Sequence, residues 1–131
     1  MPVRQLRLVV LAEDFDAALA FYRDVLGMPE AEAVSSPGGR IAILDAGRAT
    51  LELTDRSHGE YIDEVEVGRR VAGHVRVALE VEDSAGATDA AVAGGATLIA
   101  APTTTPWNSL NSRLDAPAGL QLTLFQERGA Q

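Results

Sequence analysis

Apolar and polar residues alternate at the start of the chain, and this alternation predicts a first strand at residues 4–12. Asp14 then offers a side-chain oxygen that can cap a helix. Apolar residues follow at the three- and four-residue spacing of one helix face, and Gly27 can end that helix in a left-handed conformation. Turn residues separate three further short runs, which predict strands near 28–35, 40–46 and 49–54.

The same order of elements returns in the second half of the chain. The segment RLVVLAED at 7–14 is echoed by RVALEVED at 76–83, and an alanine-rich run follows each. We predict a strand at 74–82 and a helix capped by Asp83 or Ser84 that ends at Gly94-Gly95. Three more strands are predicted near 97–101, 109–115 and 120–126, with breaks at Pro102, Pro106 and Pro117.

A polar and acidic stretch separates the two halves. Residues 56–72 predict a connector with no more than a helical turn near 61–65. The chain therefore reads as a single α+β domain, residues 1–131, built from two βαβββ modules at about 4–55 and 73–127.

Strand alternation assigns a side of the sheet to each side chain. Leucines and valines of the predicted strands face the helices, among them Val77, Leu79 and Val81, and Leu120, Leu122 and Leu124. The polar side chains left on the opposite side are Arg7, Glu52, Arg76, Glu80, Gln121 and Thr123.

Composition narrows the function classes. The net charge of −8 and the sequence pI near 4.6 argue against a nucleic-acid-binding protein, which needs a basic face. The chain has no cysteine, and no apolar run approaches the length of a membrane span. The charged N-terminus is unlike a signal peptide, so we expect a cytoplasmic protein with no nucleic-acid or membrane partner.

The βαβββ–βαβββ order, the segment AFYRDVLGM at 20–28 and the turn Pro117-Ala118-Gly119 carry a family resemblance. Together they resemble the vicinal oxygen chelate superfamily, which includes glyoxalase I, extradiol dioxygenases, and fosfomycin-resistance and bleomycin-binding proteins. The resemblance implies curved mixed sheets around a cleft (the glyoxalase-like fold), and it implies a homodimer.

The resemblance also implies where a metal would bind. In metal-dependent members, four cleft-facing ligands hold a divalent ion, and the matching positions here are Arg7, Glu52, Arg76 and Thr123. Only Glu52 is a usual ligand, because a guanidinium offers no lone pair and threonine ligates weakly. We therefore expect no metal. The alternative is a Ni, Zn, Mn or Fe site formed by Glu52 and His74 in a shifted register.

An Arg7–Glu52–Arg76 cluster could take the place of the metal. It would act either as a structural plug of paired charges or as a site where one guanidinium receives a ligand oxyanion. Trp107, the sole tryptophan, could be a flat wall of the cleft or an anchor in the core or at a dimer interface.

Three functions follow from these readings. The first is a metal-free protein of the bleomycin-resistance type that binds a small organic molecule, for example an aromatic or cationic antibiotic-like compound. The second is a divalent-metal-dependent lyase or dioxygenase that uses Glu52 and His74. The third is a metal-free isomerase or lyase in which Arg7 or Arg76 stabilises an oxyanion and Glu80 moves a proton. Whether the protein is an enzyme stays open at this point.

Overall fold

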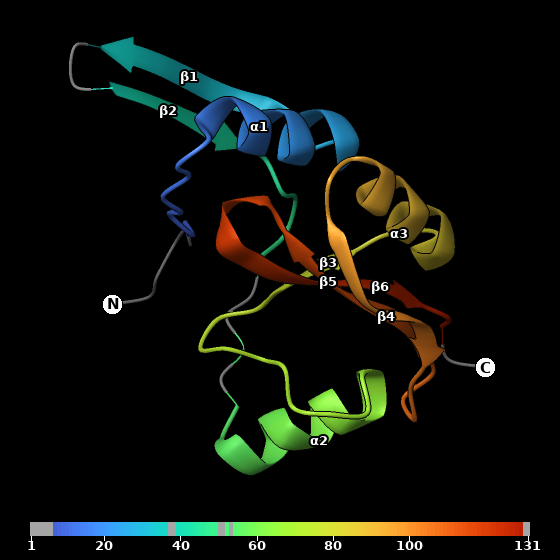
Figure 1. The fold of residues 1–131 in the computed structure, drawn as a ribbon. Coiled ribbons are helices and arrows are strands. Elements are labelled where there is room, and N and C mark those ends of the chain that lie inside the picture. Colours follow the sequence, from blue (N-terminus) through green and yellow to red (C-terminus); the bar gives the residue numbers. More distant parts are fainter. Residues whose placement is uncertain (1–6, 37–38, 50–51, 53, 130–131) are drawn as a thin grey trace.

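The computed structural model of the 131-residue chain describes residues 7–36, 39–49, 52 and 54–129. It combines helices with strands in two sheets, as Figure 1 shows. The smaller sheet pairs β1 (Glu30–Ser36) with β2 (Gly39–Leu44), and the larger has four strands in the order β3-β6-β5-β4. The predicted α+β class is confirmed.

The second module has the predicted βαβββ order. It runs through β3 (Val77–Glu80), α3 (Ser84–Ala93), β4 (Thr97–Thr104), β5 (Ser109–Ala116) and β6 (Leu120–Glu127), with a short 3₁₀ turn, η2 (Pro117–Gly119), before the last strand. β3 pairs in parallel with β6, and the other neighbours are antiparallel. The Asp83 side chain caps α3 by accepting a hydrogen bond from the Gly86 N–H at 3.1 Å.

One predicted break is wrong. β4 runs through Pro102, where the sequence analysis expected the strand to have ended. β4 lies at the edge of the sheet, and its pairing with β5 shifts register between Ala100 and Thr103. A proline without an N–H is tolerated at such an edge, because no ladder hydrogen bond depends on it.

The core lies between the four-stranded sheet and the helices on one of its faces. Leu114, Leu122 and Leu124 are fully buried there with Phe21 and Ala91. The valines and leucines assigned to this face by alternation pack against the same cluster, which confirms the assignment: Val77, Leu79, Val81 and Leu120. Phe21 belongs to the first helix, so that helix shares the core of the second module.

The first module differs from its prediction. Its helix is present as α1 (Phe15–Leu19), capped by Asp14, and continues as a π-helical stretch, η1 (Ala20–Val25). The predicted first strand is not confirmed, because residues 7–12 belong to no strand. Alternation shows that a segment can form a strand, but its backbone also needs a partner, and no described strand pairs with this one. Positions 4–6 of that strand, and 50, 51 and 53 of the strand predicted near 49–54, lie outside the described residues.

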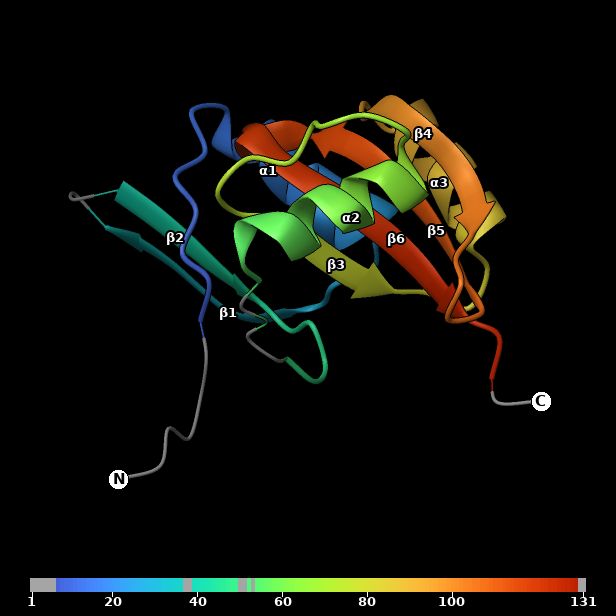
Figure 2. The ribbon, with the colours of Figure 1, turned by 90° about the horizontal axis from the view of Figure 1, so that it is seen from below.

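The connector also differs from its prediction. Residues 56–66 form the helix α2 (Arg56–Glu66), whose N-terminus is capped by Asp55 accepting from the His58 N–H at 2.9 Å. The buried side of α2 carries Asp63 and Glu66, so a search for apolar periodicity cannot detect this helix. Figures 1 and 2 show α2 lying across the face of the four-stranded sheet opposite α3. Among the described residues, no helix is both long and apolar enough to cross a membrane.

Tyr22 ties the first helix to the turn before β6. Its hydroxyl donates a hydrogen bond to the Pro117 carbonyl at 2.7 Å, and its ring packs edge-on against Phe21. Burial raises the pKa of the Tyr22 phenol to about 12. As pH rises, the Tyr22 phenol of the unfolded chain loses its proton before that of the folded chain. Tyr22 therefore lowers the free energy of unfolding between about pH 10 and 12.

A titration tests this placement. The chain has two tyrosines, so the Tyr61→Phe variant leaves Tyr22 as the only phenol. We expect its absorbance titration to have a midpoint near 12 in the folded protein and near 10 in urea. A midpoint near 10 under native conditions would mean that the phenol is open to solvent and that the first helix does not pack as described.

Candidate functional site

The candidate site is the face of the four-stranded sheet that α2 covers. Its centre is Arg113, whose side chain is fully buried on β5. The guanidinium pairs with Asp63 at 2.7 Å and with Glu66 at 2.7 Å, both from α2. It also donates to the Gln121 side-chain oxygen at 2.9 Å and, through Nε, to Glu66 at 3.2 Å.

Both carboxylates of α2 have further donors. Glu66 Oε2 accepts from the Asn111 side-chain amide at 2.6 Å, and Asp63 Oδ2 accepts from the backbone N–H groups of Val71 and Ala72 at 2.9 and 3.0 Å. Burial opposes the ionisation of Asp63, but the hydrogen bonds from Ala72, Arg113 and Val71 outweigh it and hold the pKa of this carboxyl below its usual value. Asp63 therefore acts as an ionised partner of Arg113, and Glu66 pairs with the same guanidinium.

Arg76 lies beside this network. Its Nη1 donates to the Thr123 hydroxyl at 2.6 Å, and that hydroxyl lies 3.5 Å from Glu66 Oε1. Burial, and then the like charge of Arg113, lower the pKa of the half-buried Arg76, while acids act in the opposite direction. These acids are Glu66, Asp63 and Glu52.

The structure brings together three of the predicted site residues, Arg76, Gln121 and Thr123. The predicted Arg7–Glu52–Arg76 cluster is not confirmed. Glu52 is exposed and acts on Arg76 only through its charge, and Arg7 lies exposed in the segment before α1. The arrangement observed is Arg113–Glu66–Arg76, with the Thr123 hydroxyl between Glu66 and Arg76.

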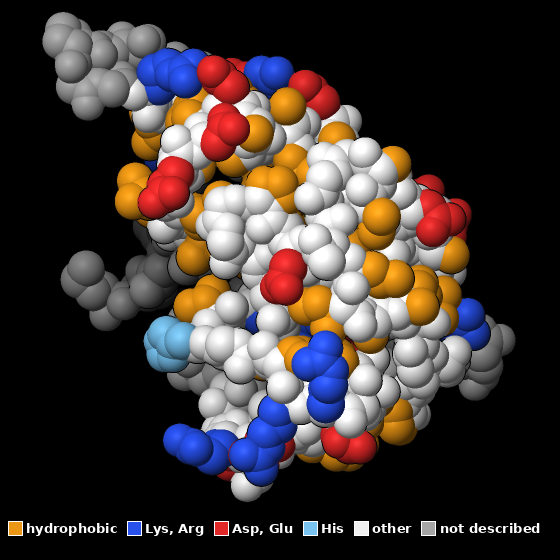
Figure 3. All heavy atoms as spheres, viewed as in Figure 1, with side chains coloured by type: hydrophobic (Ala, Val, Ile, Leu, Met, Phe, Trp, Pro, Cys, Tyr) orange, Lys and Arg blue, Asp and Glu red, His pale blue; other side chains and the backbone are white. Residues whose placement is uncertain are grey.

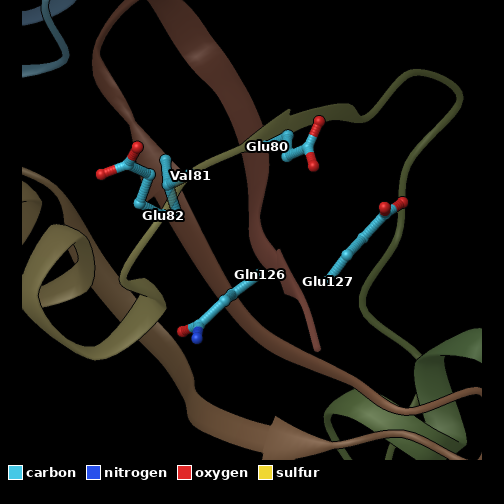
Figure 4. A pocket seen from close by; sticks show the side chains of 5 residues that line it. All are labelled: Glu80, Val81, Glu82, Gln126 and Glu127. Carbon is cyan, nitrogen blue, oxygen red and sulfur yellow. The ribbon is translucent and has the colours of Figure 1, made fainter. Parts of the chain in front are cut away.

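Three other predicted residues lie apart from the network. Glu80 lines a shallow surface depression of about 440 Å³ at the ends of β3 and β6 (Figure 4). Trp107 is 47% exposed in the turn between β4 and β5, so it is not a core anchor of this chain. His74 is exposed in the segment before β3. The remaining residues of the depression are Val81, Glu82, Gln126 and Glu127.

The sequence analysis missed four residues of the site. Asn111 and Arg113 alternate with buried Ser112 and Leu114 on β5, so the alternation used for the neighbouring strands would have assigned them to this face. Asp63 and Glu66 gave no such signal, because acidic residues three apart on a helix usually face solvent.

The second module and its polar face define a protein of the glyoxalase-like fold. The chain belongs to the Glyoxalase/Bleomycin resistance protein/Dioxygenase superfamily, whose family model matches residues 4–124. No curated protein matches the chain significantly.

Solved structures share this fold at low sequence identity. A superfamily member from Sphaerobacter thermophilus is 24% identical, with a TM-score of 0.59 over 91% of this chain and 92% of that chain. A glyoxalase-related enzyme from Fulvimarina pelagi is 18% identical, with a TM-score of 0.57 over 95% and 89%. A hypothetical protein from S. aureus is 13% identical, with a TM-score of 0.63 over 96% and 95%.

The residues at the four expected metal-ligand positions do not fit a divalent cation. Two are arginines, and the oxygen of the third, Thr123, already accepts a hydrogen bond from one of them. The fourth position, Glu52, is the one of these four that carries a usual metal ligand. Among the residues that the structure describes, no group of three or more histidine and acidic side chains is placed to hold a metal ion.

Removal of Arg113 tests whether the network is as closely paired as described. We expect Arg113→Met to lower the free energy of unfolding by about 3–5 kcal/mol, because it leaves Asp63 and Glu66 buried without their cation. The matched control is Arg40→Met, which removes an exposed ion pair with Asp16 at 2.9 Å and a cation–π contact with Phe15, and it should cost no more than about 2 kcal/mol. Urea denaturation measures both, and equal losses would contradict the burial of Arg113.

Proposed function

We propose that this chain is a metal-free protein of the glyoxalase/bleomycin-resistance type that binds a small organic molecule at Arg76, Gln121 and Thr123. The observation that carries the proposal is the 2.6 Å hydrogen bond from Arg76 to Thr123. It joins two positions at which metal-dependent relatives are expected to supply ligands, and it directs a positive charge at the place where the ion would be held.

Electrostatics supports the same proposal. Arg76 and Arg113 lie close enough that the charge of Arg113 lowers the pKa of Arg76. A divalent cation at this point would be repelled by Arg76 with about 4 kcal/mol per unit charge at 4 Å and an effective dielectric constant of 20. Polar groups on a sheet face suit an organic ligand better, because hydrogen-bond donors can orient such a ligand without a metal.

The two enzymatic alternatives have less support. A metal-dependent lyase or dioxygenase would need Glu52 and His74, and both are exposed. A metal-free isomerase or lyase would pair Arg7 or Arg76 with Glu80. Glu80 instead lines the depression at the ends of β3 and β6, four residues along the chain from Arg76, and Arg7 lies exposed in the segment before α1. The proposed cytoplasmic location rests on the sequence alone.

Metal titration is the first test of this proposal. We expect untagged protein to carry no stoichiometric metal and to show no rise in melting temperature with Ni²⁺, Zn²⁺, Mn²⁺ or Fe²⁺. A metal ion that binds the folded protein would instead add about 2.7 kcal/mol of stability at a concentration of a hundred times its Kd. The control is a Glu52→Gln/His74→Gln variant. A metal-dependent rise that this variant abolishes would replace the proposal with the shifted-register metal site.

We also propose that the protein forms a homodimer. Besides the family resemblance, the proposal is supported by an apolar segment before α1, in which Leu8, Val9 and Leu11 are 56%, 84% and 88% exposed. Light scattering should give twice the chain mass of 13.8 kDa. Val9→Glu/Leu11→Glu should shift the protein toward monomer without loss of fold, whereas Val92→Glu, at an exposed position of α3, should leave the oligomeric state unchanged. A monomeric wild type at micromolar concentration would contradict the dimer.

A further inference from the structure

The hydrogen bonds of the site divide its two arginines into one whose donors are occupied and one whose donors are not. Arg113 makes four hydrogen bonds, two to Glu66 and one each to Asp63 and Gln121. A guanidinium has five N–H donors, so Arg113 has almost no capacity for a further partner.

The carboxylate oxygens of Asp63 and Glu66 on α2 are likewise occupied by hydrogen bonds. Each oxygen of Glu66 and of Asp63 already accepts at least one hydrogen bond from Arg113, Asn111 or the backbone at 71–72. Neither carboxylate comes within ion-pair distance of Arg76 in the described part of the chain. Arg113 offsets one of their two negative charges, so the group of Arg113, Asp63 and Glu66 carries a net charge of −1.

Arg76 is therefore the cation of this face with unused donors. Its one hydrogen bond within the described residues goes to a neutral hydroxyl, that of Thr123. The guanidinium is half-buried, so part of its surface has lost water without gaining an anionic acceptor. Such a group binds a planar oxyanion well, because two parallel N–H bonds match two oxygens.

We infer that the ligand of this site carries an oxyanion, a carboxylate or a phosphate group, which accepts hydrogen bonds from the guanidinium of Arg76. This inference rests on the proposed function and names the class of its ligand. Thr123 accepts a hydrogen bond from this guanidinium and holds it in place from one side.

The net charge of −8 does not oppose this assignment, because the acids are distributed unevenly. Glu80, Glu82 and Glu127 line the depression at the ends of β3 and β6 (Figure 4), and acidic side chains lie at several separate places on the face drawn in Figure 3. Of the acids that act on Arg76, Asp63 and Glu66 are paired with Arg113, and Glu52 is exposed. A cationic ligand would meet the guanidinium of Arg76, because Arg113 is fully buried.

The test uses NMR of arginine Nε–H groups in ¹⁵N-labelled protein. The probes are benzoate, its neutral analogue benzamide, and inorganic phosphate. We expect benzoate or phosphate to shift the Arg76 Nε–H signal with a saturating dependence on concentration, and benzamide to leave it unmoved. Whichever of the two anions binds more tightly distinguishes a carboxylate ligand from a phosphorylated one.

Variants make the result specific to one side chain. Arg76→Gln should weaken the tighter anion by about tenfold or more, and exposed Arg48→Gln should not change its affinity. If Arg76→Gln fails to fold, Arg76→Lys keeps the charge, loses the planar fork and should give an intermediate affinity.

The outcomes separate this inference from the proposed function. No response of Arg76 up to the solubility limit of both anions, or equal effects of Arg76→Gln and Arg48→Gln, would overturn the oxyanion site. If benzamide shifts the backbone signals of Gln121 and Thr123 while benzoate does not move Arg76, the binding face stands and the ligand class is wrong. Stabilisation by a metal with no response to any organic probe would overturn both.

Discussion

The pairing of Arg113 with Asp63 and Glu66 is the constraint on which the rest of the site depends. A buried guanidinium without partners would cost several kcal/mol, so the two acids must lie over the sheet wherever Arg113 is enclosed. This requirement fixes α2 across the polar face and fixes the face itself, because Asn111, Gln121 and Thr123 complete the hydrogen bonds that the charged groups need. Among the described residues, no buried side-chain nitrogen or oxygen lacks a partner.

The same network determines what Arg76 can do. If Glu66 had been shared equally between the two arginines, the site would be a closed ionic plug. Glu66 instead lies 2.7 Å from Arg113, and only the Thr123 hydroxyl stands between it and Arg76. The ion network of Arg113, Asp63 and Glu66 thus forms its hydrogen bonds without Arg76, which lies beside it with one hydrogen bond, to Thr123, among the described residues.

The second module was predictable because its local and tertiary signals agree. Val77, Leu79, Leu122 and Leu124 alternate with polar residues, and Asp83 caps the helix that covers them. The prediction of a first strand failed because its local and tertiary signals disagree. Residues 7–12 have the alternation of a strand, but a strand also needs a neighbour to take its backbone hydrogen bonds, which alternation cannot supply. α2 was missed because its buried side is acidic, and acidic residues are read as solvent-facing unless their cation is known.

The sequence by itself determined the family, the α+β class, the side of the sheet on which Arg76, Gln121 and Thr123 lie, and the poor match of the expected metal positions to a cation. These depend on residue type and on a two-residue period, both of which are local. Only the tertiary structure decided which acid pairs with which arginine. Glu66 and Arg113 are 47 residues apart, and whether a charge is occupied or available depends on distances across such separations. Of the predicted trio of Arg7, Glu52 and Arg76, Arg76 joins the observed network through Thr123, and the fold supplied the other members.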